Sequence, residues 1–208
     1  MKNDLNDKQI QILEVAENLF AEKGFDGTSI RDISKMAKIN VAMVSYYFGS
    51  KEKLLESLIL FKTSGLKEQL VHLIEENLEP VEKINRLIDL YINRLNCNRG
   101  IYRILHFELA SKKRVLELES FTEIKKSNLR SLELIIKEGQ AKGVFRKDVI
   151  IPLITPTILG TYFHFQMNKP FFEDLLNLKT EEAYNNYIQT DLTKHIQQTI
   201  KALLVYEN

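Results

Sequence analysis

The chain has 208 residues, of which 44% are hydrophobic, so it can bury a substantial core as one compact unit or as two small ones. Its 29 basic and 28 acidic residues leave a net charge of +1, which excludes a protein that binds polyanions over its whole surface but not one with a local DNA-binding face. Cys97 is the only cysteine, which excludes an intramolecular disulfide and favours a reducing, cytoplasmic location.

Apolar residues recur at helical spacing from end to end, without sustained alternation, so we expect an all-α protein of about nine helices. A first amphipathic helix ends at Gly24. Thr28 or Ser29 can cap a short second helix, Asn40 a very short third helix, and Ser50 a fourth. The expected inner faces of the first two helices carry Ile10, Leu13, Ala16, Phe20, Ile30, Ile33 and Ala37.

Beyond Gly65 the helical patterns become longer. They cover Pro80 to about Asn96 and then residues 100–110, 113–141, 149–168 and 181–205. No repeat, low-complexity tract or flexible linker interrupts them. We therefore expect residues 1–53 to form an N-terminal domain with three short helices, and residues 54–208 to form a larger C-terminal helical domain.

Residues 28–51, TSIRDISKMAKINVAMVSYYFGSK, contain two short helices with a tight turn around Lys38–Asn40. This pattern is typical of a helix-turn-helix, in which one helix braces a second against the major groove of DNA. We expect the buried side to hold Ile30, Ile33, Ala37, Val41, Val44 and Phe48. The outward side then offers small residues and tyrosine hydroxyls, which suit close approach to a groove and to phosphates. Residues 28–53 carry five basic and two acidic side chains, a local charge of +3 that favours DNA.

The run from Ile10 to Leu54 resembles the DNA-binding domain of the TetR family of transcriptional regulators. Order, spacing and residue type agree at Ala16, Leu19, Phe20, Lys23-Gly24-Phe25, Thr28, Ile30-Arg31-Asp32-Ile33, Ala37 and Tyr46-Tyr47-Phe48-Gly49-Ser50-Lys51-Glu52-Lys53-Leu54. The chain departs from the family at Lys38-Ile39-Asn40, where glycine often follows the turn, and at Tyr47, where histidine is frequent. Neither departure is incompatible with the fold.

The resemblance implies which residues contact DNA. Contacts to the sugar–phosphate backbone would come from Thr28, Ser29, Tyr46, Tyr47 and Lys51. Positions at or near base edges would be those of Arg31, Asn40, Val41, Ala42 and Ser45. Arg31 could instead be a surface residue paired with a neighbouring acid. The tyrosines could be core aromatics, although adjacent helical residues cannot both point inward.

The resemblance also implies a ligand pocket among the middle helices and a homodimer built from two late helices. The pocket candidates are Tyr91, Arg94, Phe107, Phe121, Tyr162 and Phe165, each of which could instead be an ordinary packing residue. The dimer candidates are Leu153, Thr157, Gly160 and His164 on one helix, with Leu192, Ile196, Thr199 and Leu203 on the last. A second face, with Ile154, Ile158, Tyr162 and Phe165, suits the protomer's own interior. Packing within one chain is the alternative for both dimer stripes.

Other functions fit the chain less well. The four histidines are scattered, no phosphate-binding glycine loop or nucleophile elbow is present, and we expect no enzyme, metal or cofactor. Neither a signal peptide nor a run of about 20 apolar residues predicts membrane insertion. A helical adaptor for proteins is the more serious rival, and repression rather than activation rests on the resemblance alone. We expect a sequence-specific transcriptional regulator, a cytoplasmic dimeric repressor that a small-molecule effector releases from its DNA operator.

Overall fold

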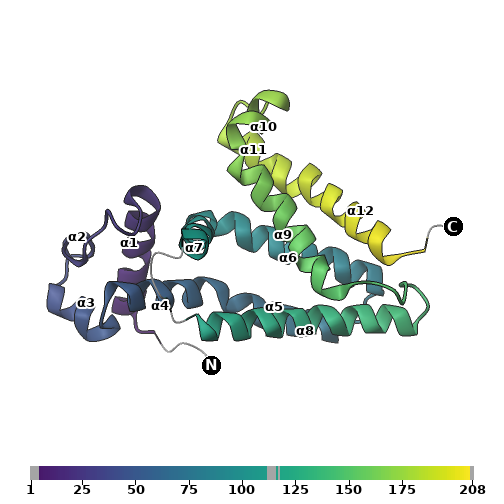
Figure 1. Cartoon of the computed structure of the whole chain (residues 1–208), viewed down its shortest axis with the longest axis horizontal. Coiled ribbons are helices and arrows are strands. Elements are labelled where there is room, and N and C mark those ends of the chain that lie inside the picture. Colours follow the sequence, from purple (N-terminus) through teal and green to yellow (C-terminus); the bar gives the residue numbers. More distant parts are fainter. Residues whose placement is uncertain (1–4, 112–115, 117, 207–208) are drawn as a thin grey trace. The chain divides into compact units, whose positions relative to one another are not determined.

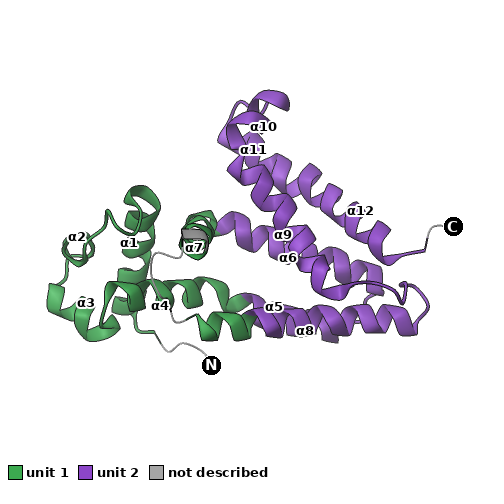
Figure 2. Cartoon of the chain, in the orientation of Figure 1, with its two compact units in different colours: residues 1–65, 98–124 green, residues 66–97, 125–208 purple. Residues whose placement is uncertain are grey.

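The computed structural model describes residues 5–111, 116 and 118–206, and within these ranges the chain forms helices and no strand (Figure 1). The expected all-α class is confirmed. The chain divides into two compact units, one of residues 1–65 and 98–124 and one of residues 66–97 and 125–208 (Figure 2). The expected boundary after residue 53 was drawn between a DNA-binding part and a ligand-binding part, and it differs from the boundaries of the two compact units. As a functional boundary it stays a prediction.

The helices of the first unit begin where short polar side chains can bond the free amides of the first turn. Asn6, Ser29, Asn40 and Ser50 each accept a hydrogen bond from an amide in the first turn of the helix that follows. Ser29, and not Thr28, therefore caps the second helix. The unit comprises α1 (Asp7–Lys23), α2 (Ile30–Met36), α3 (Val41–Phe48), α4 (Lys51–Thr63) and α7 (Arg99–Ser111).

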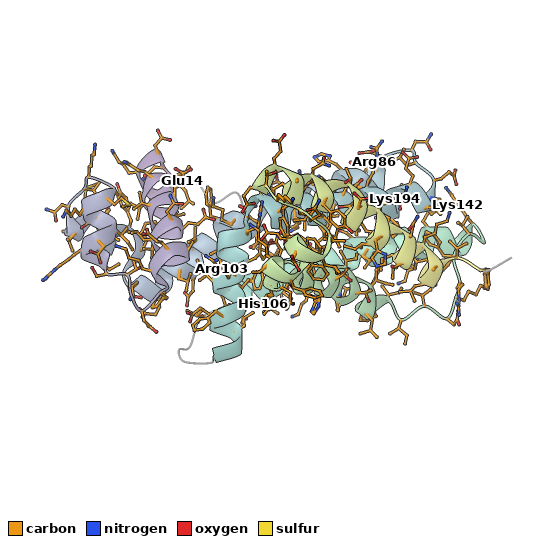
Figure 3. The ribbon with its side chains drawn as sticks, turned by 90° about the horizontal axis from the view of Figure 1, so that it is seen from above. Glu14, Arg86, Arg103, His106, Lys142 and Lys194 are labelled. Carbon is orange, nitrogen blue, oxygen red and sulfur yellow. The ribbon has the colours of Figure 1, made fainter. Side chains whose placement is uncertain are left out.

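The core of this unit includes a helix from later in the chain. Ile101, Ile104 and Leu105 of α7 are buried in the same apolar cluster as the inner face of α1. Gly100 of α7 lies against Ala21 of α1, where an added Cβ atom would make an ordinary van der Waals contact of 3.4 Å with the Cβ of Ala21. The guanidinium of Arg103 (Figure 3) donates to the carbonyl oxygen of Ala21 over 2.7 Å. The N-terminal helices thus share one core with α7.

The second unit contains the longer helices. They are α5 (Gly65–Glu75), α6 (Pro80–Cys97), α8 (Glu119–Ala141), α9 (Ile151–Met167), α10 (Lys169–Leu175), α11 (Glu181–Tyr187), the π-helical turn η1 (Ile188–Leu192) and α12 (Thr193–Leu204). Sequence patterns did not predict α5 or α10 as separate helices. The expected start of a helix at residue 113 falls on residues 112–115 and 117, which lie outside the described residues.

Two features fix the packing of α8. Lys83 of α6 is buried, and its ammonium donates to the carbonyl of Ile74 over 2.8 Å and to the carboxylate of Glu138 over 2.9 Å. Hydrogen bonds from Lys83 and Lys142 lower the pKa of Glu138. Gly139 is required by close packing, because a Cβ there would lie 2.1 Å from the ring of Phe145. These contacts join α8 to α5, to α6 and to the segment that follows it.

Candidate nucleic-acid interface

A short buried face holds α2 and α3 together. Ile33 and Ala37 are fully buried, and Val44 and Phe48 of α3 are 1% and 7% exposed. The side-chain amide of Gln11 on α1 donates to the carbonyl of Ala37 over 3.2 Å, which satisfies the end of α2. The expected helix-turn-helix is therefore present, with the inner face of α3 fixed and its outer face available.

The outer face of α3 carries small and polar residues. Val41, Ala42, Ser45 and Tyr46 are exposed and, at spacings of one, four and five residues, they lie on one side of the helix. Val41 is 40% exposed, so its expected place in the buried face was wrong, because the inward positions belong to Val44 and Phe48. The side chain of Asn40 accepts from the amide of Ala42 over 2.9 Å.

The two adjacent tyrosines have different surroundings. Tyr46 is 85% exposed. Tyr47 is partly buried against the apolar cluster of the first unit, and the two ring centroids are 5.4 Å apart. Tyr46 is thus free to reach a ligand without disturbing the core, whereas Tyr47 contributes packing as well.

Two residues expected at the DNA surface bond instead to the protein's own backbone. Thr28 is 1% exposed, and its hydroxyl oxygen lies 2.8 Å from the carbonyl of Gly24 and 3.1 Å from that of Leu19. The ammonium of Lys51 donates to the carbonyls of Phe25 and Thr28 over 2.9 Å each and lies 4.2 Å from the Phe25 ring centroid. These side chains fix the loop between α1 and α2.

The beginning of α2 is closed by a reciprocal cap. Ser29 accepts from the amide of Asp32, and the carboxylate of Asp32 accepts from the amide of Ser29 over 3.0 Å. The bonds from Ser29 hold the pKa of Asp32 below its usual value, so the cap persists at neutral pH and is lost only as the pH falls through that lowered pKa. Arg31 is exposed and forms no ion pair with a described residue, so the alternative of a surface pair is not seen.

The six pocket candidates are divided between the two units. Tyr91, Tyr162 and Phe165 are buried in the second unit, where Arg94 is partly buried. Phe107 is 57% exposed on α7 of the first unit. Phe121 packs against the core of that unit. A pocket formed by all six is not seen within either unit.

An open pocket of about 300 Å³ lies within the second unit. It is lined by Thr161, Phe165, Phe172, Leu176, Tyr187, Leu192 and His195. The ring of Phe165 stacks on those of Phe172, Tyr184 and Tyr187 at centroid distances of 4.6, 5.2 and 5.6 Å. Of the six pocket candidates only Phe165 lines it, so sequence reasoning missed this hollow.

The late helices present two different faces. The expected interior residues of α9, namely Ile154, Ile158, Tyr162 and Phe165, are all buried. Leu192 and Ile196 are also buried, at 6% and 2% exposure, which corrects their expected place on an outer dimer stripe. Leu153 and Leu203 are 56% and 46% exposed, Gly160 and His164 are exposed, and Thr157 and Thr199 are partly exposed. Only these six dimer candidates remain available at the surface of the protomer.

The described helices include none that is both long and apolar enough to cross a membrane. Within the same residues, no three His, Cys, Asp or Glu side chains are grouped as a metal site would require.

Comparisons with known families cover most of the chain. Residues 12–58 match the family described as bacterial regulatory proteins, tetR family. Residues 80–200 match the tetracyclin repressor-like C-terminal domain.

Individual proteins resemble the chain over most of their length. The HTH-type transcriptional repressor NicS of Pseudomonas putida is 29% identical, over 76% of this chain and 75% of that protein. The fatty acid metabolism regulator protein of Bacillus subtilis is 28% identical, over 74% of this chain and 79% of that protein. The crystal structure of the regulator FadR from Bacillus subtilis in complex with stearoyl-CoA shares the fold, with a TM-score of 0.72 and 23% identity over 93% of this chain and 97% of that one.

The internal role of Thr28 predicts an effect on stability. Thr28→Val keeps the shape but removes the hydroxyl that bonds the carbonyls of Gly24 and Leu19, so the free energy of unfolding should fall by about 1–3 kcal/mol in urea titrations. Thr28→Ser retains the hydroxyl and should recover most of this loss. Equal stability of the valine variant and the wild type would contradict the bracing role.

Proposed function

Because the chain belongs to the tetR family of bacterial regulatory proteins, it is a DNA-binding transcriptional regulator, and we propose that it acts as a dimeric repressor that a small molecule releases from its operator. The observation that carries this proposal is the outer face of α3. That face is exposed over its whole length, while the inner face of the same helix is fixed in the core. A protein-binding adaptor would need a broad aliphatic surface there, whereas this chain presents Ser45 and Tyr46.

The exposure of each residue refines the expected DNA contacts. We assign Val41, Ala42 and Ser45 to base edges in the major groove, because small side chains let the helix approach closely and alanine can contact a thymine methyl group. Arg31 on α2 and Asn40, the residue that precedes α3, are also exposed, and we keep both as candidates near base edges. Phosphate contacts are assigned to Ser29, Tyr46 and Tyr47. Thr28 and Lys51 would support DNA binding indirectly, because they fix the loop that precedes α2.

The exposed side of α9 and α12 supports a dimer. Gly160 lies inside α9, yet a Cβ atom there would meet nothing within 4 Å, so packing inside the protomer does not require glycine. Glycine within a helix costs about 1 kcal/mol relative to alanine, and close approach of a partner helix would account for it. Leu153 and Leu203 add exposed apolar area on these two helices, which pack together. A dimer would place two copies of α3 in successive major grooves, about 34–36 Å apart.

The order of the helices provides a route from ligand to DNA. Helix α6 of the second unit ends at Cys97, and α7 of the first unit begins at Arg99. Because α7 shares its core with α1, a displacement of α7 would act directly on the helix-turn-helix. A ligand that binds the two conformations with affinities differing by a few kcal/mol would then shift the balance between DNA-bound and released protein.

For the effector we infer a molecule with a long apolar part, and an acyl-CoA thioester is the first candidate. The fatty acid metabolism regulator of Bacillus subtilis is similar in sequence, and the FadR structure of the same fold holds stearoyl-CoA. In the second unit the side-chain oxygens of Asn128 and Thr155 are buried and form no hydrogen bond with a described residue. Buried polar atoms of this kind are costly unless they are paired, and polar atoms of a ligand could pair with them.

The decisive experiment is selection of duplexes from random DNA, followed by titration of the purified protein at physiological salt. We expect a pseudo-palindromic site, bound by two protomers or a multiple of two, and preferred over unrelated DNA by at least about a thousandfold. Stearoyl-CoA should release the complex, whereas CoA without an acyl chain serves as the control. Equal and weak binding to all duplexes would contradict the proposed function and favour a protein partner.

Removal of the exposed Tyr46 ring should weaken DNA binding without affecting the fold. Because a phosphate contact carries no sequence information, Tyr46→Ala should lower the affinity for selected and unrelated duplexes by a similar factor. Tyr46→Phe removes only the hydroxyl, so comparing its affinity with that of Tyr46→Ala separates the hydrogen bond to phosphate from the contact that the ring makes with DNA. A Tyr46→Ala protein with wild-type affinity would remove this residue from the contact surface.

Charges placed on the exposed side of α9 and α12 should separate the protomers. The variant Leu153→Lys/Leu203→Lys should stay folded, because both positions are exposed in the protomer. It should sediment as a monomer, since the charges would face each other across the proposed interface, and it should therefore lose operator binding. Leu192→Lys is the matched contrast: it places a charge in the interior, so it should lower the melting temperature instead. A double variant that still sediments as a dimer would place the interface elsewhere.

A further inference from the structure

The end of α2 is formed by a lysine in a conformation that favours glycine. Lys38 has φ of 53°, its amide donates to the carbonyl of Lys35 over 3.2 Å, and the amide of Ile39 donates to the carbonyl of Ser34 over 3.0 Å. This pair of bonds is the Schellman arrangement, whose left-handed residue is usually glycine because a Cβ atom is disfavoured there. The backbone at Lys38 is therefore strained by its own side chain.

The fold gives no reason to retain a lysine at this position. Elsewhere in the described residues, positive φ occurs at Gly24, Gly49 and Gly143, and at Asn177, a residue type that tolerates this conformation. The Lys38 side chain is exposed, and no ion pair or hydrogen bond joins its ammonium to a described residue. The strain is thus not offset by an ion pair or a hydrogen bond from the side chain within the described chain.

The surroundings of Lys38 indicate what its charge can bind. Arg31 and Lys35 are exposed four residues apart on one side of α2, and Lys38 is exposed just beyond the end of that helix. The carboxylate of Asp32, the nearest acid in this stretch, is bonded to Ser29 at the other end of the helix. Lys38 lies two residues before Asn40, which caps the exposed helix α3. An unpaired cation thus lies beside the beginning of the helix that we assign to the major groove.

We propose that Lys38 binds a DNA phosphate at the edge of the groove that α3 enters, and that its charge is retained there in spite of the backbone strain. The inference rests on the proposed function and adds to it a contact that the motif does not supply. The ammonium of lysine acts on phosphate as a point charge, independent of base sequence. Two opposite effects follow: removal of the charge weakens DNA binding, and replacement by glycine stabilises the fold.

The test compares three variants of Lys38 on the duplex selected for the wild type and on an unrelated duplex, across a range of salt. Lys38→Gln retains the strain but not the charge, and should lower the affinity about fivefold for each bound protomer. The slope of log affinity against log salt should become shallower by about 0.9 for each protomer. Lys38→Gly should lose the same amount and melt about 2–4 °C higher. Lys38→Arg should bind as the wild type does.

Lys67→Gln is the matched control, because it removes the same charge from an exposed position on α5, in the second unit. It should leave both affinity and slope unchanged. Wild-type affinity and slope in Lys38→Gln would overturn the inference and leave Lys38 as a helix-end residue only. Failure of the wild type itself to bind any duplex would contradict the proposed function as well, so the two failures are distinguishable.

Discussion

The apolar core that α1 shares with α4 and α7 is the constraint on which the DNA-facing surface depends. A body of about 60 residues buries too little surface to be more than marginally stable. Here the core is enlarged by Ile101 and Leu105, from a helix that begins 36 residues after α4 ends. The burial of these residues and the bond from Arg103 to Ala21 fix α7 on α1. Helix α7 therefore shares a core with the DNA-facing helices, and it follows directly in the chain after α6 of the second unit.

Polar residues of the helix-turn-helix serve two distinct purposes. Thr28, Ser29 and Lys51 bond to backbone groups that the short helices and their loops leave unpaired. Such short helices have few intrahelical hydrogen bonds, so these side-chain bonds are needed to fix the backbone. Tyr46 and Arg31 make little contribution of this kind and are exposed. The family motif contains both the residues that fix the backbone and the residues that are exposed, because a DNA-facing surface needs both.

The late helices show how one apolar segment can supply both an interior and an outer surface. In α9 the buried positions Ile154 and Ile158 alternate with exposed Leu153 and Gly160, so both faces of the helix are apolar. An amphipathic pattern indicates its inner face by contrast with polar residues, and this contrast is weak in α9. In the proposed dimer the outer face packs against a second protomer, whereas the inner face packs against other helices of the same protomer.

The sequence by itself determined the all-α class and the caps of α3 and α4, and it narrowed the cap of α2 to two adjacent residues, because capping and helical spacing are local interactions between residues a few positions apart. It also placed Ala42, Ser45 and Tyr46 on the exposed face of α3, but it assigned Val41 to the buried face, where the structure exposes that side chain. Only the tertiary structure decided that Thr28 is buried, that Leu192 is interior while Leu203 is exposed, and that α7 completes the first core. These outcomes depend on which distant helices pack together, and several apolar stripes of this chain would have allowed other pairings.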